Sequence, residues 1–352
     1  MLYLDHGLGV SFDNDKKYFS LNTDVEAITY LQLANALIRE INPNAITIAE
    51  DMSGMPGMAL PIEDGGIGFD YRLAMGLPDL WVRLLKEQTD EQWDIGKIWG
   101  ELCLRRSGEK TVAYVECHDQ ALVGDKTLMF RLADARMYTD MDKNIRNPDI
   151  DRAMSLHKLI RLMTFAAGGD AYLNFMGNEF GHPEWIDFPR EGNNWSVLYC
   201  RRQWNLLDNA DLKYRMLADF DQDIVALAFN DLVFEQAMPD LIYLDHGAKV
   251  IAFRRSQLMF VFNFNPTQNY EPYYLPVPGG GLYEIVMASD DLFYGGDGRV
   301  VHKRHMVRRD AENKHKLALM LPARTAIVVR VPKTQVADPV LMRRLPRRRL
   351  VY

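Results

Sequence analysis

The feature that most constrains the fold is a repeated unit in which a short apolar run is followed at once by polar or charged side chains. Such runs occupy residues 45–49, 111–115 and 171–176. Each is apolar without strict alternation, which is typical of a strand buried on both faces in a parallel sheet. A helical pattern precedes the first run, and another, over residues 152–167, precedes the third. The alternation of helix and strand predicts an α/β fold built from βα units.

The first helical pattern has a recognisable start and stop. Thr23 and Glu26 have the spacing of a capping box, in which the two side chains satisfy each other's backbone amides. Apolar residues then recur at helical intervals until residues 42–44, an Asn-Pro-Asn sequence that cannot continue a helix. We therefore predict a helix from Thr23 to the residue before Asn42.

From about Asp240 the pattern changes to short strand-like runs separated by Gly, Pro and Asn, which predicts a small antiparallel sandwich. The runs are residues 249–253, 258–263, 283–288, 316–320 and 325–331. We assign residues 1–220 to the α/β part, 221–335 to an all-β domain and 336–352 to a basic tail. The arginines of the tail predict a solvated terminus.

Composition narrows the class of protein. Hydrophobic residues make up 48% and charged residues 25% of the chain, as in a soluble globular protein. The net charge of -7 argues against a nucleic-acid binder, which needs a clustered excess of Lys and Arg. No apolar window is long enough to span a membrane. The three cysteines, Cys103, Cys117 and Cys200, form no CxxC pair, which fits a reducing cytoplasm.

Two acids stand where a barrel of parallel strands holds its catalytic groups. Glu50 follows the first apolar run, and Asp119 follows the second. The carboxyl ends of parallel strands meet at one edge, and two carboxylates there can divide the work of a glycosidase. Two alternatives stay open: an acid just past a strand can simply cap the next helix, and His118 can be a satisfied core histidine.

Three longer strings resemble signature regions of the glycogen and starch branching enzymes of the alpha-amylase superfamily. The first is ITIAEDMSGMP at residues 46–56, with a second part at 68–75, and the next is AYVECHDQALVGDKT at 113–127. The third begins NFMGNEFGHPEW at residue 174, runs on to residue 190 and is the most specific of the three. The resemblance extends from Met1 to about Val331.

The resemblance implies roles for individual residues. Glu50 falls on the family's general acid/base, and Asp119 falls on the aspartate that stabilises the transition state. His118 matches a histidine that hydrogen-bonds the sugar at the cleavage point. Trp185 is a candidate platform for stacking a glucose ring, or else packs between loop and barrel. Cys117 replaces the usual serine, a change between two small side chains.

The resemblance also implies a missing portion. The family's first two signature regions, which carry a sugar-contacting histidine, an arginine and the nucleophilic aspartate, are expected before Met1. Asp5 and Asp13 are close to that point but are expected on a loop, away from the tip of a strand. We therefore expect the later half of a TIM-type barrel followed by an all-β sandwich, without the nucleophile. Either an N-terminal half or another polypeptide completes the barrel, or its strands curl into an open sheet whose edge is covered by loops or a partner. The isolated chain is expected to be inactive.

The implied activity is cleavage of an alpha-1,4 glucan and transfer of the chain to a 6-hydroxyl, which forms an alpha-1,6 branch. The expected partner is an alpha-glucan polysaccharide, and no metal or organic cofactor is expected. Two alternatives remain at this stage. One is a non-catalytic glucan-binding fragment, and the other is an alpha-glucan hydrolase of the same superfamily.

Overall fold

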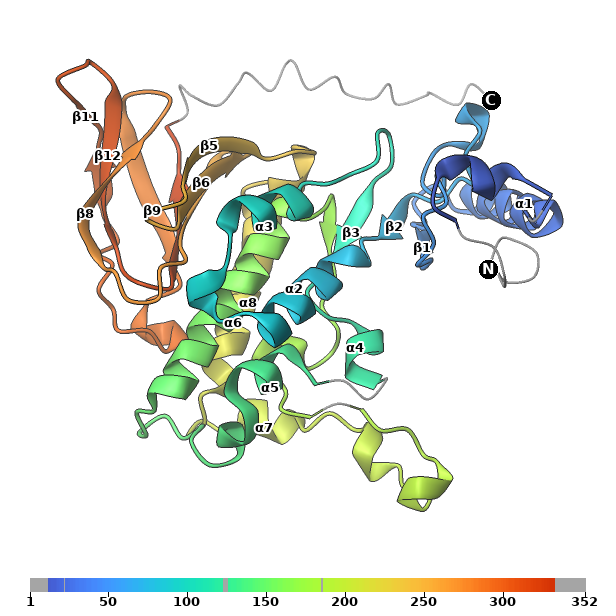
Figure 1. Ribbon diagram of the computed structural model, residues 1–352, viewed down its shortest axis with the longest axis horizontal. Helices are drawn as coiled ribbons and strands as arrows, with labels where there is room; N and C mark the ends of the chain where they lie inside the picture. Colours follow the sequence, from blue (N-terminus) through green and yellow to red (C-terminus); the bar gives the residue numbers. More distant parts are fainter. Residues whose placement is uncertain (1–11, 22, 123–125, 185, 333–352) are drawn as a thin grey trace.

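The computed structural model describes residues 12–21, 23–122, 126–184 and 186–332 of the 352-residue chain. Trp185 and the basic tail at 336–352 lie outside the described residues. Figure 1 shows three parts in a row, with the antiparallel strands on one side, a group of helices in the middle, and the short parallel strands with helix α1 on the other side.

A parallel sheet with the order β1-β2-β3-β4 confirms the predicted α/β part. Each neighbouring pair is parallel, so the carboxyl ends of the strands lie along one edge. The strands are β1 (Ile48–Ala49), β2 (Tyr71–Leu73), β3 (Thr111–Ala113) and β4 (Ala171–Tyr172). The sequence did not predict β2, because a three-residue strand next to Gly and Asp gives no apolar run.

The prediction that the first apolar run is buried on both faces is wrong. Ile46 is 67% exposed and Ile48 is 48% exposed. The physical reason is the place of β1 at the end of the sheet, where its one strand partner among the described residues is β2. An edge strand of this kind keeps the apolar composition of a buried strand without the neighbour that would cover it.

Helix α1 (Val25–Ile41) matches the predicted helix, but its cap is a different residue. Asp24 is the N-cap, and its side chain accepts a hydrogen bond of 2.9 Å from the Ala27 backbone amide. Thr23 instead donates its hydroxyl to the Tyr18 carbonyl. The predicted capping box at Thr23 is therefore one residue too early, because an acceptor side chain at the next position competes for the same role.

The central helices form the main core. Helix α6 is almost wholly buried, and Asn147 caps it by accepting hydrogen bonds from the Asp149 and Ile150 amides. The helices after α1 are α2 (Gly76–Glu87), α3 (Ile95–Leu102), α4 (His118–Leu122), α5 (Leu128–Ala133), α6 (Pro148–Ala167), α7 (Trp204–Asp208) and α8 (Tyr214–Asn230). None of the described helices has the length and apolar character needed to cross a membrane.

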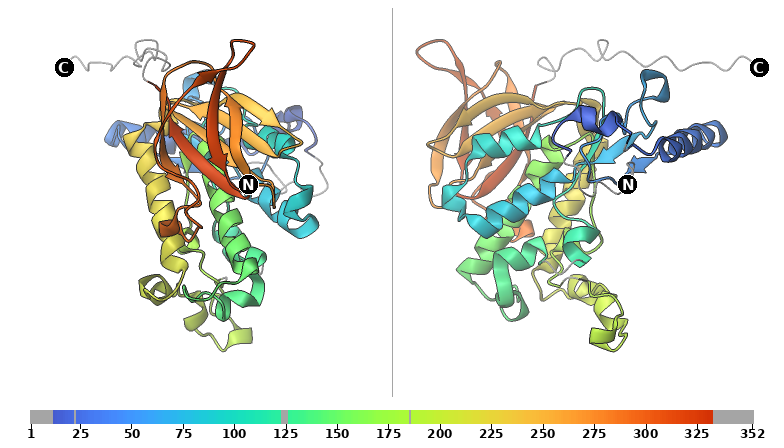
Figure 2. Two further views of the ribbon diagram at one scale, coloured as in Figure 1. Left: turned by 90° about the vertical axis from the view of Figure 1, so that its left-hand side faces the viewer. Right: turned by 45° about the vertical axis from the view of Figure 1, so that its right-hand side comes forward.

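The last third of the chain forms two antiparallel sheets, which confirms the predicted all-β domain (Figure 2). A second apolar core lies between them. One sheet has the order β10-β9-β13-β7-β6-β5 and the other β11-β12-β8. The strands are β5 (Asp240–Asp245), β6 (Val250–Arg255), β7 (Leu258–Asn263), β8 (Tyr270–Pro276), β9 (Leu282–Ala288), β10 (Arg304–Met306), β11 (Arg308–Arg309), β12 (His315–Leu321) and β13 (Thr325–Arg330). The predicted boundary after residue 220 falls inside α8, ahead of the first of these strands.

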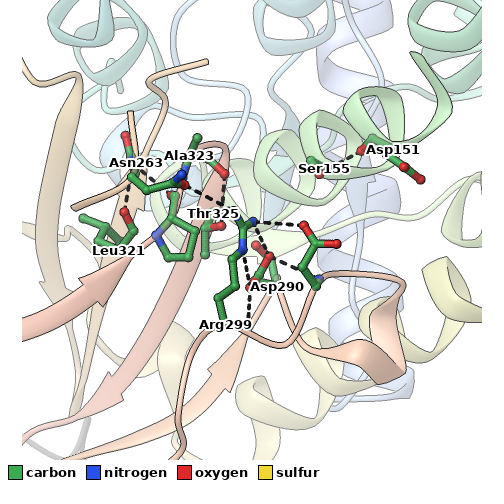
Figure 3. Close-up of polar contacts among 12 residues, drawn as sticks. Asp151, Ser155, Asn263, Asp290, Arg299, Leu321, Ala323 and Thr325 are labelled. Carbon is green, nitrogen blue, oxygen red and sulfur yellow. Dashed lines mark hydrogen bonds and ion pairs between the residues drawn. The ribbon is translucent and has the colours of Figure 1, made fainter. Parts of the chain in front are cut away.

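Buried polar contacts fix the antiparallel domain to the helices. Arg255 of β6 is fully buried and donates to the carbonyls of Ala166 and Gly169 at the end of α6. Lys158 of α6 donates in the other direction, to two carbonyls of the segment that follows β9. Figure 3 shows how that segment is closed, with the Arg299 side chain turned onto Asp290 at 2.6 Å.

Candidate active site

The carboxyl-terminal edge of the parallel sheet brings three of the predicted site residues together. Glu50 comes directly after β1, and His118 and Asp119 begin helix α4 after β3. Nε2 of His118 lies 2.8 Å from Oε1 of Glu50 and 3.3 Å from Oδ1 of Asp119. One imidazole nitrogen therefore contacts two carboxylates that are 69 positions apart in the sequence, and we call these three residues the carboxylate–histidine cluster.

The exposure of these side chains weakens the structural alternatives. His118 is 40% exposed, so it is not a core histidine. Glu50 caps no helix, because the next helical turn along the chain begins at Ile62. Asp119 lies in the first turn of α4, where a carboxylate also interacts favourably with the free amides of the helix. All three groups are open to solvent and within reach of a ligand.

The segment after Glu50 is held by an arginine from the neighbouring strand. Arg72 of β2 donates at 2.9 Å to the carbonyls of Ser53 and Met55, and its guanidinium lies 3.6 Å from the buried Glu109 carboxylate. Since each of these bonds joins a charged donor to a backbone acceptor, they are stronger than neutral ones. Asp51, the second acid after β1, accepts from Ser53 and so has the local turn role that its sequence context indicates.

Two further contacts set the direction of His118 and Asp119. Just before them, the buried Glu116 accepts a 2.7 Å hydrogen bond from the Leu128 amide, and burial raises the pKa of its carboxyl. Just after them, the Gln120 side chain accepts from the Cys117 amide at 2.9 Å. The turn that presents the site is thus fixed on both sides by hydrogen bonds to the backbone.

The most specific string of the sequence, at residues 174–184, supports the fold around the site. The side-chain amide of Asn174 donates to the Asp221 carboxylate of α8 at 2.6 Å. Arg161 of α6 donates to the side chains of both residues. His182 is buried, and its Nε2 accepts from the Gln203 amide at 3.0 Å. Burial, together with the nearby Arg202 guanidinium, lowers the pKa of His182 to about 4. A neutral His182 therefore pins the loop after β4 against the body of the molecule.

Some predicted residues are not placed in the cluster. Trp185 and Asp5 lie outside the described residues, so their predicted positions are not observed. Asp13 is exposed and lies 3.0 Å from Lys17. The exposure of Tyr138 and Tyr199 could not be predicted from the sequence, since neither residue follows a predicted strand or belongs to a periodic pattern.

The donor atoms of the carboxylate–histidine cluster lie within 4.8 Å of one another, so the same three residues are also a possible ligand set for a cation. The chemistry that the geometry supports without a metal is proton transfer. Two carboxylates in contact with one imidazole are side chains of the kind that carry protons to and from reacting groups in general acid and base catalysis. The roles assigned to Glu50 and Asp119 by resemblance remain predictions that this geometry permits.

The fold defines the class of protein. An alpha-amylase of Geobacillus thermoleovorans, solved with acarbose, matches with a TM-score of 0.53 and 16% identity over 87% of this chain and 57% of that chain. A gamma-cyclodextrin glucanotransferase of an alkalophilic Bacillus clarkii matches with a TM-score of 0.55 and 12% identity over 86% and 38% of the two chains. The profile described as "Alpha amylase, C-terminal all-beta domain" matches residues 243–332. The chain therefore has an alpha-amylase-type fold.

Sequence identity relates the chain to one group of curated proteins. The 1,4-alpha-glucan-branching enzyme of Equus caballus is 48% identical over 94% of this chain and 48% of its own length. That of Solanum tuberosum is 49% identical over 86% of this chain and 35% of its own. The chain is a homologue of the 1,4-alpha-glucan-branching enzymes, as its signature strings predicted. It spans about half the length of the curated relatives it matches, or less.

Proposed function

We propose that this chain supplies the general acid/base and the transition-state stabiliser of a branching reaction on an alpha-glucan. The observation that carries the proposal is the contact of one His118 nitrogen with the carboxylates of Glu50 and Asp119, at 2.8 and 3.3 Å. These three side chains come from the segments that follow two different strands of the parallel sheet, β1 and β3, and they meet at one place. Homology to branching enzymes supports an alpha-1,4 glucan as the donor.

In the proposed first step, Glu50 protonates the departing alpha-1,4 oxygen as a nucleophilic carboxylate attacks the anomeric carbon. The Glu50 carboxylate then removes a proton from the 6-hydroxyl of a second glucan segment, which displaces the enzyme and forms an alpha-1,6 bond. Asp119 faces the positive charge that develops on the sugar ring, and His118 donates to a sugar hydroxyl. The nucleophile is proposed to come from sequence outside the 352 residues, since relatives are about twice as long.

The open side of the parallel sheet supports a partner for this chain. Helix α1 carries apolar side chains in contact with solvent, and β1 presents an edge with one neighbour among the described residues. The exposed set is Tyr30 at 71%, Leu33 at 66%, Leu37 at 56% and Ile41 at 74%. Most folded proteins cover a strand edge that has no partner and an apolar helix face beside it. We propose that the earlier strands and helices of a barrel cover it.

The proposed compartment is a reducing one, the cytoplasm. Cys103, Cys117 and Cys200 all lie in the described part of the chain, and none of them forms a disulfide. Burial raises the pKa of Cys103 to about 11, which makes its thiol unreactive. A chain with free cysteines of this kind does not need an oxidising environment to fold.

The test is a chimera that joins the amino-terminal half of the Equus caballus enzyme to this chain, incubated with amylose and analysed for alpha-1,6 linkages. We expect branches from the chimera and about a 100-fold or larger loss of rate in Glu50→Gln, because general acid/base catalysis contributes about 10² to 10⁴ in rate. The matched control is Glu40→Gln, an exposed glutamate of α1.

The outcomes separate the alternatives. Branches made by the 352-residue chain alone would mean that an aspartate within it is the nucleophile, and the proposed external nucleophile would be wrong. Short linear products without alpha-1,6 linkages would favour a hydrolase. A chimera that folds and binds amylose but leaves it unchanged would favour a non-catalytic glucan-binding role.

A further inference from the structure

A cavity of about 480 Å³ lies on the segment that follows β4. Its walls come from Tyr138, at the end of a short helical turn, from Glu184, and from parts of the segment 187–199. No member of the carboxylate–histidine cluster lines it. The segment of residues 187–200 projects from the body of the molecule in both views of Figure 2. The cavity is therefore a separate site, built from loops that follow the same edge of the parallel sheet.

The polar side chains of this cavity are fixed before any ligand arrives. Arg190 contacts both oxygens of Asp187, at 2.8 and 3.1 Å. Asn193 donates to Asp187 at 3.1 Å and accepts from the Arg190 amide at 3.0 Å. The hydrogen bond from Arg190 lowers the pKa of Asp187, so its carboxyl stays ionised at neutral pH. A carboxylate, a guanidinium and an amide are thus held in set directions beside the cavity.

Aromatic rings stand beside these groups with their surfaces open. Tyr138 is 55% exposed and Tyr199 is 56% exposed, and both line the cavity. The next residues along the same segment, Asn194 and Trp195, have φ angles of 55° and 56°. A left-handed conformation is unusual for a bulky aromatic residue, and such residues cluster at active sites and ligand-binding segments. Trp195 is nevertheless held in it, by a 2.9 Å bond from its amide to the Arg190 carbonyl, with its ring 69% exposed.

The chemistry of the lining selects the ligand. Exposed aromatic faces complement the apolar faces of sugar rings, and fixed carboxylate, guanidinium and amide groups bond to hydroxyls. An anionic ligand is disfavoured, because two carboxylates, Glu184 and Asp187, face one guanidinium. We propose that this cavity binds a segment of alpha-1,4-glucan at a distance from the reacting bond. The proposal rests on the proposed function for the class of ligand.

The proposal gives the two sites different roles. The carboxylate–histidine cluster acts at the reacting bond, whereas the cavity between Tyr138 and Tyr199 holds another part of the same polymer or of the acceptor chain. Binding there raises the concentration of glucan beside the cluster without touching the reacting atoms. A ligand shorter than the distance between the two sites gains nothing from it.

Calorimetric titration of the 352-residue chain with maltoheptaose tests the proposal. We expect the double variant Tyr138→Ala/Tyr199→Ala to weaken the Kd by at least about tenfold, as the loss of two stacking surfaces implies. The matched control is Tyr274→Ala, because Tyr274 of β8 is 58% exposed and lines a different cavity. Circular dichroism of the variants checks that the fold is kept.

Each outcome decides the matter. A tenfold weaker Kd in the double variant and an unchanged Kd in Tyr274→Ala support the site. An unchanged Kd in the double variant overturns the inference, as does a chain that binds no maltoheptaose. Neither of these results touches the proposed function, which stands or falls separately on alpha-1,6 linkages in the chimera and their loss in Glu50→Gln.

Discussion

Helices α6 and α1 are of similar length, yet they lie in opposite surroundings. Most of α6 is buried between the other central helices and the antiparallel domain, whereas Asn35 is the single buried residue of α1. On the α6 side even the charges are paired, since Asp90 contacts Arg152 and Arg324 at 2.6 Å each. On the α1 side, Ile28 and Leu31 pack against a small core, whereas the opposite apolar residues of the helix face water.

The difference shows which side of the parallel sheet is complete within the described residues. The β3 side, which carries His118 and Asp119, is supported by a packed core and by the antiparallel domain. The β1 side, which carries Glu50, ends at an edge strand and an apolar helix face. The two halves of the carboxylate–histidine cluster therefore rest on supports of different stability, and four substitutions measure that difference.

Arg255→Ala is expected to have the largest effect on stability. It removes the donor of four backbone carbonyls, of which those of Ala166 and Gly169 are buried and those of Gln236 and Ala237 are partly buried. Leaving buried acceptors unpaired costs about 3–5 kcal/mol in all. Urea unfolding measures the loss. The control is Arg83→Ala, whose pair with Glu101 is half-exposed and worth less than about 1 kcal/mol. Equal effects would contradict a complete interface on this side.

Leu159→Ala tests the packing of α6 itself. Leu159 is fully buried in the main core, and the cavity left by the substitution is expected to cost about 3 kcal/mol. The same urea titration reports it as a lower midpoint with an unchanged slope. A loss below about 1 kcal/mol would mean that this core is loosely packed.

His182 is expected to make stability depend on pH. The pKa is about 4 in the folded chain against an ordinary value of 6.5, so the unfolded chain binds the proton more tightly. The contribution is therefore fully present above pH 6.5 and is lost as the pH falls toward 4. Its size is about 2–3 kcal/mol. Urea midpoints measured between pH 7 and pH 4 should fall less steeply in His182→Asn, and parallel curves would refute the assignment.

Leu37→Ala is expected to have the smallest effect, although it is the same substitution as in α6. Leu37 is 56% exposed, and its truncation should change the unfolding free energy by no more than about 0.5 kcal/mol. Sedimentation velocity should show less self-association, because an exposed apolar face becomes smaller. A loss of 2 kcal/mol or more would mean that α1 is packed in solution.

The sequence predicted the α/β part and the all-β domain because both depend on local patterns. Helix–strand alternation and short runs between Gly, Pro and Asn are visible without tertiary contacts. The cap of α1 was wrong by one residue, since Thr23 and Asp24 are both good caps and only the folded chain distinguishes them. The exposure of Ile46 and Ile48 could not be predicted. An apolar run indicates that a strand is suited to burial, but it does not show whether neighbouring elements cover that strand.

The candidate site was predictable in part for a related reason. Glu50, His118 and Asp119 follow strands, and the rule for parallel strands places such residues at one edge. The string at residues 174–184 was noticed only for its resemblance, and the buried His182 with its contact to Gln203 shows that it supports the fold. The cavity between Tyr138 and Tyr199 could not be predicted, because these residues are 61 positions apart and only the fold brings them together.

Amide hydrogen exchange of the 352-residue chain, resolved by residue, tests the central claim most directly. The claim is that the support of Glu50 is open, whereas the support of His118 and Asp119 is complete. We expect the amides of α6 to exchange only through global unfolding and those of α1 to exchange at least about 100-fold faster through local opening. Equal protection of the two helices would contradict the claim, because α1 would then belong to the same cooperative unit as the core.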